Sequence, residues 1–289
     1  MLNFVHDGYQ LIIYWSPKCG CTSLRRYIEQ LYTGQDCSDY DAQINMTKYT
    51  RKLIPYQKYQ DYIQIWVVRN PLSRLVTFFA HTLYNGCLIN KFQLSDEQFI
   101  EKIRKVIAPF MTLPLSGEII ISIEKLKKSC TFRHFVELIS LIPTTQYEFH
   151  LSPQVSMFPL EAEAYQMPHY TQIKFTEIIR LEDANLYFQK LSQKFGVNYQ
   201  LPKQNTHNVN YSQAVQSVMD IDIVEYIDKW HTVPQFEYFY DQTLIDTVKQ
   251  IYAEDFYVYQ NLSIPKNSID LDCIEPDRSG LENNTQRFQ

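Results

Sequence analysis

Short apolar runs alternate along the chain with segments in which apolar residues recur at helical spacing. Residues 10–15 form the first run, which is rich in β-branched and aromatic residues and predicts a buried strand. A loop follows at residues 16–22. In residues 24–31 the apolar positions then recur at i, i+3, i+4 and i+7, which predicts a helix ending near Gly34. The pattern therefore predicts a strand, a tight loop and a helix in succession.

A second junction of the same kind lies further along the chain. Residues 35–62 are polar and rich in tyrosine without a sustained period, so we expect irregular structure there. Residues 63–68 predict another buried strand, which runs into Arg69. Asn70 can cap a helix and Pro71 suits its first turn, so a second helix is predicted directly after this strand.

The same patterns predict the later elements. A capping-box pattern at residues 95–98 opens a helix that continues to about Val106. The other predicted elements are helices at residues 131–141, 185–195 and 243–259 and a strand at residues 173–181. Strands that alternate with helices indicate an α/β fold, a single P-loop-like domain with a central, mainly parallel sheet flanked by helices. We assign residues 1–264 to this domain and expect residues 265–289, which are polar, to form a flexible tail.

Composition narrows the classes of partner. The 289 residues carry a formal net charge of −5, which argues against a nucleic-acid partner and, less strongly, against a polyanionic acceptor. No segment reaches the roughly 18 apolar residues of a membrane span, and residues 1–8 lack the build of a signal peptide. The six cysteines are scattered without metal-site or disulfide spacing. We therefore expect a cytoplasmic protein with reduced thiols and no bound metal; the oligomeric state is not indicated.

The loop at residues 17–23, Pro-Lys-Cys-Gly-Cys-Thr-Ser, contains the residue types that an anion-binding loop needs. Backbone N–H groups converge on an anion where a strand leads into a helix. Gly20 lets the chain turn and an oxyanion approach, Lys18 adds a positive charge, and Thr22 and Ser23 add hydroxyl donors. The lysine precedes the glycine, so this is not a Walker A loop. Taken alone, the loop is also consistent with a helix start beside an incidental lysine.

Two motifs resemble those of the sulfotransferases. The P-K-x-G-x-T-S form resembles the family's 5′-phosphosulfate loop, and residues 69–77 resemble its 3′-phosphate motif, R-[DN]-P-x-x-R-x-x-[ST]. The resemblance implies that 3′-phosphoadenylyl sulfate is the donor and leaves as 3′,5′-ADP. It implies a donor site formed by Lys18, Cys19, Gly20, Cys21, Thr22, Ser23, Arg69 and Thr77. For Arg74, in the second motif, ligand contact and structural pairing both stay open.

Further segments are similar to one branch of the family, the carbohydrate sulfotransferases related to the chondroitin, dermatan and HNK-1 enzymes and their bacterial cytoplasmic relatives. These segments are the H-x-x-P-Q motif at residues 150–154, residues 178–183, and residues 240–256 with their Y-x-x-D-F ending. Members of the secretory pathway carry cysteines shortly after the P-Q pair. Met157 and Leu160 stand there in this chain, which fits the expectation of a cytoplasmic enzyme.

The resemblance also implies an in-line transfer of the sulfuryl group without a metal. Lys18 and the loop amides are placed in the sequence to stabilise the charge that develops on the leaving phosphate. An acceptor hydroxyl needs a general base, and histidine suits neutral pH. The candidates are His150, supported by its motif, and His81, about one turn beyond Thr77 on the same predicted helix.

The acceptor is indicated only as a class. It is a hydroxyl or amine of a small molecule, such as a cationic secondary metabolite, or of a sugar. Two other functions stay open: a nucleotide kinase-like phosphotransferase, which lacks support because the Walker A lysine is absent, and a non-catalytic nucleotide-binding protein. The presence of Lys18, Arg69 and Thr77 argues against the second alternative.

Overall fold

The computed structural model of the protein describes residues 2–38, 59–111, 115–157, 175–201, 217–230 and 233–263. The chain divides into two compact units. Unit 1 consists of Met1–Arg69, Gln154–Asn205 and Tyr257–Gln289, and unit 2 consists of Asn70–Pro153 and Thr206–Phe256. Each unit has hydrophobic clusters of its own.

Unit 1 contains a sheet of four strands in the order β1-β2-β3-β4 within the described part of the chain. The strands are β1 (Leu2–His6), β2 (Leu11–Trp15), β3 (Ile63–Val68) and β4 (Glu177–Arg180). β1 runs antiparallel to β2, whereas β2, β3 and β4 are parallel, with Ile13 opposite Ile65 and Val67 opposite Ile179. The predicted α/β class with a mainly parallel sheet is confirmed.

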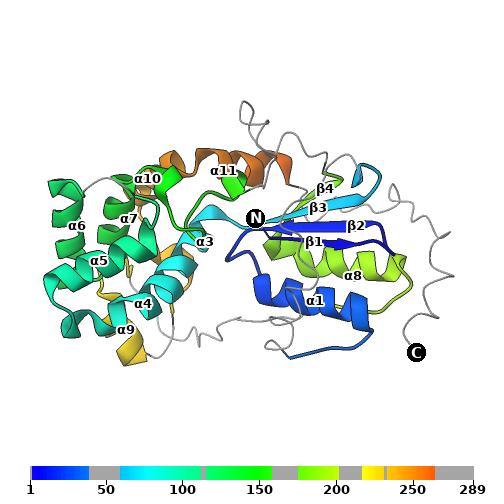
Figure 1. Ribbon diagram of the computed structural model, residues 1–289, viewed down its shortest axis with the longest axis horizontal. Helices are drawn as coiled ribbons and strands as arrows, with labels where there is room; N and C mark the ends of the chain where they lie inside the picture. Colours follow the sequence, from blue (N-terminus) through cyan, green and yellow to red (C-terminus); the bar gives the residue numbers. More distant parts are fainter. Residues whose placement is uncertain are drawn as a thin grey trace. The chain divides into compact units, whose positions relative to one another are not determined.

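Helices cover the sheet of unit 1. They are α1 (Cys21–Thr33), α8 (Ala184–Lys194) and the π-helix η10 (Val258–Leu262), with 3₁₀ turns η5 (Gln154–Met157) and η8 (Leu181–Asp183). Because side chains alternate along a strand, Leu11, Ile13 and Trp15 of β2 pack with α1 and α8, which lie on the same side of the sheet (Figure 1). Ile12 and Tyr14 pack in a separate cluster that includes Val258. Both faces of β2 are buried, as its continuous apolar run predicts.

Unit 2 is helical in its described residues (Figure 1). Its elements are α3 (Pro71–Thr77), the π-helix η2 (Phe78–Leu83), α4 (Tyr84–Gly86), η3 (Leu88–Gln93), α5 (Asp96–Ile107), α6 (Gly117–Lys128), α7 (Phe132–Ser140), η4 (Thr144–Gln146), α9 (Ile223–Trp230), η9 (Phe236–Phe239), α10 (Gln242–Ile251) and most of α11 (Ala253–Tyr257). Aromatic rings fill its core, with Phe79 packed against Phe132, Phe135 and Phe239. Within the described ranges, none of the helices combines the length and apolar character that crossing a bilayer requires.

Several predicted elements have different bounds in the structure. The strand expected at residues 173–181 is β4, which covers Glu177–Arg180, and its first two predicted residues lie outside the described ranges. The helix expected at residues 243–259 is interrupted at Tyr252, where φ is −116° and ψ is 35°. The tail expected from residue 265 also lies outside the described residues. The helical spacing of apolar residues therefore predicted that residues 243–259 are helical, but it did not predict the interruption of the helix at Tyr252.

Candidate functional site

The loop after β2 has a backbone shape that only some residues tolerate. Lys18 and Gly20 have positive φ values of 65° and 72°, whereas Cys19 between them keeps a negative φ. The Cys19 N–H donates to Ser16 O at 3.2 Å and closes the turn. Turns in which left-handed residues alternate with right-handed ones form concavities of N–H groups that bind anions.

Two features of the structure favour glycine at residue 20. Its left-handed φ disfavours any residue with a side chain. In addition, a Cβ atom at residue 20 would lie 2.5 Å from Cδ1 of Leu181, the residue that follows β4. The loop is therefore packed closely against the end of another strand of the sheet.

Helix α1 begins directly at this loop and presents the positive end of its dipole there. The first intrahelical bond runs from Leu24 N to Gly20 O at 2.9 Å, so the N–H groups of Cys21, Thr22 and Ser23 have no partner within the helix. The N-cap is Gly20, and no acidic residue occupies the first turn. These N–H groups are the ones that an anion at a helix N-terminus uses.

Arg69, at the end of β3, contacts the loop in the same unit. Its Nη1 donates to Lys18 O at 2.8 Å, while the N–H of the same peptide bond donates to Ser16 O. The peptide between Lys18 and Cys19 is thus held at both ends. The sequence motif predicts a phosphate contact for Arg69, and the guanidinium, which has five N–H donors, also orders the loop.

Gln154 connects the loop after β2 with Arg69 inside unit 1, a role that was not predicted from the sequence. Its Oε1 accepts from Arg69 N and from Cys19 Sγ, both at 3.0 Å, and its Nε2 donates to Arg69 O at 2.9 Å. Ser16 Oγ lies 3.5 Å from the same Oε1. Gln154 is 1% exposed. The only sequence signal for this role is the Pro-Gln pair that ends the H-x-x-P-Q motif.

The cysteines of the loop point their sulfur atoms into the protein. Cys19 is fully buried, and its Sγ also lies 3.0 Å from Ser16 Oγ, while Cys21 Sγ lies 3.7 Å from Ser16 O. Any contact of Cys19 with a ligand must therefore come from its main chain. Cys19, Cys21 and the other described cysteines are free thiols.

After Arg69, the 69–77 motif consists of Asn70 and the whole of α3, in unit 2. Asn70 caps this helix by accepting from Leu72 N at 2.9 Å, and Pro71 occupies its first turn, as predicted. Thr77 is the last residue of α3 and is half-buried. Its hydroxyl donates to Ser73 O at 2.9 Å.

Arg74 makes the structural pairing that the sequence left open. It is 3% exposed, and its Nη2 donates to His150 O at 3.1 Å and to Ser152 O at 2.8 Å. Tyr252, at the break between α10 and α11, donates its hydroxyl to Leu151 O at 2.9 Å. These bonds fix the backbone of residues 147–153, which carries the candidate base.

His150 itself is accessible and is held by a neighbouring acid. Its side chain is 41% exposed, and its Nδ1 lies 2.8 Å from Glu148 Oε1. Oε2 of the same carboxylate accepts from His150 N at 2.6 Å. Glu148 belongs to none of the motifs recognised in the sequence. His81, the other candidate base, lies in the π-helix η2 and is half-buried.

The fold and the loop define the chain as an α/β protein whose strand–loop–helix unit is shaped to hold an anion. The sequence model of the sulfotransferase family matches residues 3–260. The chain therefore belongs to the sulfotransferase family, which confirms the resemblance at the level of the family. No curated protein and no solved structure matched the chain. Its assignment to the carbohydrate branch stays a prediction.

Proposed function

We propose that the protein transfers a sulfuryl group from 3′-phosphoadenylyl sulfate to a hydroxyl or amine of an acceptor. The observation that carries this proposal is the loop at residues 17–23 in a chain of the sulfotransferase family. The loop combines left-handed backbone at Lys18 and Gly20 with the open N-terminus of α1. This arrangement suits a 5′-phosphosulfate, which needs several N–H donors and a positive charge.

The residues of the two motifs are assigned to the two ends of the donor. Lys18 and the main-chain N–H groups of the loop and the first turn of α1 bind the 5′-phosphosulfate. Arg69 and Thr77 bind the 3′-phosphate, by a guanidinium fork and a neutral hydroxyl. The Thr77 hydroxyl hydrogen would have to leave Ser73 O to donate to a phosphate.

The transfer requires a proton acceptor and a stabilised leaving group. In the proposed step, the acceptor oxygen or nitrogen bonds to sulfur while the bond between sulfur and the bridging phosphate oxygen breaks. The bonding electron pair leaves with 3′,5′-ADP, and Lys18 stabilises the charge that develops there. His150 accepts the acceptor's proton, a role that its accessibility permits.

The acceptor is proposed as a small molecule or a sugar. The net charge of −5 favours a neutral or cationic acceptor over a polyanion, and a cationic secondary metabolite fits this preference. We also propose that the reaction takes place in the cytoplasm, because the cysteines show no disulfide spacing.

A screen of candidate acceptors with labelled donor, read as the mass gain of one sulfuryl group, tests this function. Lys18→Ala is expected to reduce transfer to near background. The charge-matched control Lys128→Ala, on the exposed end of α6, is expected to keep it. Turnover of ATP that depends on Mg²⁺ would instead support the kinase-like alternative. Tight 3′,5′-ADP binding without transfer to any acceptor would favour the non-catalytic one.

A further inference from the structure

Glu148 and His150 are joined through both oxygens of one carboxylate. Oε2 accepts the main-chain N–H of His150 at 2.6 Å, and Oε1 lies 2.8 Å from the ring atom Nδ1. The two residues are separated by Phe149, whose side chain is exposed and whose ring lies edge-on to the imidazole at 6.0 Å. The carboxylate therefore fixes the imidazole relative to the backbone of its own residue.

The chemistry of the carboxylate determines which ring nitrogen carries the hydrogen. An ionised carboxylate only accepts hydrogen bonds. At 2.8 Å from Oε1, Nδ1 of His150 must therefore be the donor. In the neutral imidazole the lone pair is then on Nε2, the nitrogen that does not face the carboxylate.

The backbone around the pair is held from both sides, so the arrangement does not depend on the two side chains alone. Glu148 N donates to Ile107 O at 2.8 Å, and Glu148 O accepts from Leu151 N at 2.8 Å and Ser152 N at 2.9 Å. His150 O accepts from Arg74. Both ends of the carboxylate bridge thus start from a fixed main chain, which favours one ring orientation.

We propose that Glu148 is the positioning residue of the general base: it holds His150 in the Nδ1–H tautomer and leaves Nε2 as the proton-accepting atom. This inference rests on the proposed function only in assigning the base role to His150. In the transfer step, Nε2 takes the proton of the acceptor hydroxyl or amine as the new bond to sulfur forms. The ring becomes the imidazolium, whose Nδ1–H stays bonded to the Glu148 carboxylate.

Glu148→Gln is the informative variant because it keeps the shape of the side chain. The main-chain N–H of His150 can only donate, so it takes the one oxygen of the amide. The NH₂ group then faces Nδ1 and requires it to accept, which moves the hydrogen to Nε2. The variant is expected to lower kcat by about 100-fold or more, with the Kd for 3′,5′-ADP unchanged.

Two measurements test the inference. ¹⁵N NMR of the imidazole at alkaline pH, with the His150 signals assigned by their loss in His150→Ala, reports the tautomer without any acceptor. It should show the Nδ1–H form in the wild-type protein and the Nε2–H form in Glu148→Gln. Transfer kinetics then report kcat. Glu137→Gln, a change at an exposed acid on α7 of the same unit, should alter neither.

A ring that keeps its Nδ1 hydrogen in Glu148→Gln, or a kcat equal to that of the wild-type protein, would overturn the inference. These results differ from a failure of the proposed function. If the wild-type protein transfers no sulfuryl group to any acceptor, the proposed function fails, and the tautomer measurement still shows whether Glu148 sets the state of the ring.

Discussion

The loop at residues 17–23 in unit 1 runs into the first turn of α1, whereas the segment at residues 147–153 in unit 2 lies outside the helices, and the two are held in shape differently. The loop relies on left-handed backbone at residues 18 and 20 and on the helix that begins there, and Arg69 and Gln154 bond to residues 18 and 19. The segment depends on side chains from distant parts of the chain. Arg74 reaches the carbonyls of residues 150 and 152, and Tyr252 reaches that of residue 151.

The two arginines of one motif each support one of these two regions. Arg69 lies in unit 1, is half-buried and donates to the loop at Lys18 O. Arg74 lies in unit 2, is buried and donates to the 147–153 segment. Residues five positions apart in sequence thus serve different pieces of backbone. One motif can therefore combine a residue that orders a candidate binding loop with one that supports a separate backbone segment.

The largest effect is expected when the backbone of the loop is changed, because this change combines a loss of stability with a loss of nucleotide binding. Gly20→Ala combines a left-handed alanine, at a cost of about 1–2 kcal/mol, with a Cβ placed 2.5 Å from Leu181. We expect unfolding free energy to fall by more than about 2 kcal/mol and 3′,5′-ADP binding to be lost in calorimetry.

Gly34→Ala, at the other end of α1, is the matched control. Gly34 has nearly the same φ, 73°, but its Cβ would meet only Tyr199 Oη, at 3.5 Å. This variant should show the backbone cost alone, about 1–2 kcal/mol, with nucleotide binding intact. Equal nucleotide affinity in the two variants would contradict the view that the shape of the loop is what binds the anion.

The next largest effect is expected from Arg74→Met in unit 2. The change leaves the carbonyls of His150 and Ser152 without this buried donor, and each unsatisfied group costs about 1–3 kcal/mol. Urea unfolding should show a loss of about 3 kcal/mol. Arg104→Met, which removes a surface pair with Glu101, should cost less than about 1 kcal/mol. Similar losses in both variants would show that the 147–153 segment does not depend on Arg74.

A smaller effect is expected from Gln154→Met, which keeps the length of the side chain. It removes the acceptor of Arg69 N and the donor to Arg69 O. We expect a loss of about 2 kcal/mol in unfolding free energy and a roughly tenfold weaker 3′,5′-ADP affinity, since a tenfold change corresponds to about 1.4 kcal/mol. Gln193→Met, at an exposed position on α8, should change neither. An unchanged affinity in Gln154→Met would mean that the loop holds its shape without Gln154.

The same contrast explains how far the sequence could predict the structure. The strand–loop–helix of unit 1 is local, so the apolar run at residues 10–15 and the glycine at 20 were sufficient to locate it. Strand β1 was missed because its five residues gain their stability from pairing with β2, and helices α6 and α9 were missed as well.

In the candidate site, the contacts that the sequence could not predict depend on the folded chain. Gln154 lies 85 residues from Arg69 in sequence, and no local pattern reveals which backbone groups its amide bonds. Glu148 is close to His150 in sequence, but an acid two residues from a histidine acquires meaning only when the turn brings its carboxylate to the ring. At the break after α10, Tyr252 also makes a long-range bond, to Leu151 O, that no local pattern reveals.

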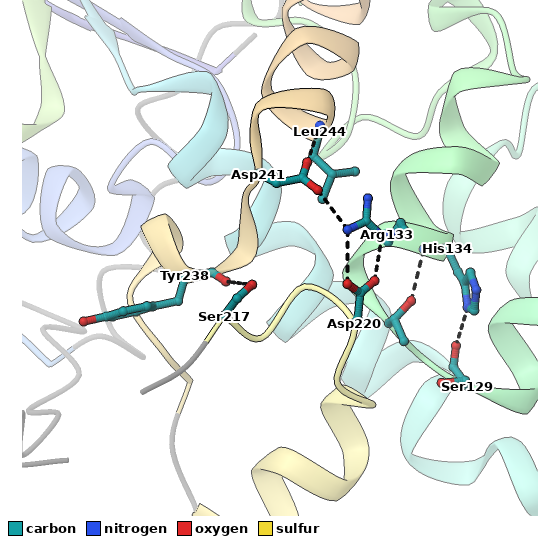
Figure 2. Close-up of polar contacts among 9 residues, drawn as sticks. Ser129, Arg133, His134, Ser217, Asp220, Tyr238, Asp241 and Leu244 are labelled. Carbon is teal, nitrogen blue, oxygen red and sulfur yellow. Dashed lines mark hydrogen bonds and ion pairs between the residues drawn. The ribbon is translucent and has the colours of Figure 1, made fainter. Parts of the chain in front are cut away.

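The smallest effect is expected at the surface of unit 2, where Arg133 pairs with two aspartates (Figure 2). Arg133 on α7 donates through Nε and Nη2 to Asp220 at 2.6 and 3.1 Å, and through Nη2 to Asp241 at 2.9 Å. Asp241 also caps α10 by accepting from Leu244 N at 2.8 Å. The Arg133 guanidinium lowers the pKa of the Asp220 carboxyl, and the Leu244 N–H followed by Arg133 lowers the pKa of Asp241.

The sign of the pH effect follows from these lowered pKa values. An acid whose pKa is lower in the folded state adds stability above its unfolded pKa of about 3.9, and this stability is lost as the pH falls through the folded value. Arg133→Gln should therefore cost about 0.5–1 kcal/mol at pH 7, a small value because Asp220 is exposed and the other two side chains are partly exposed to solvent. The cost should shrink toward zero in acid as the aspartates become protonated. Arg133→Lys keeps the charge without the fork and should cost less. Urea unfolding of both variants at neutral pH and near pH 2–3 measures these costs. A cost that is the same at the two pH values would show that Arg133 acts through packing rather than through the two aspartates.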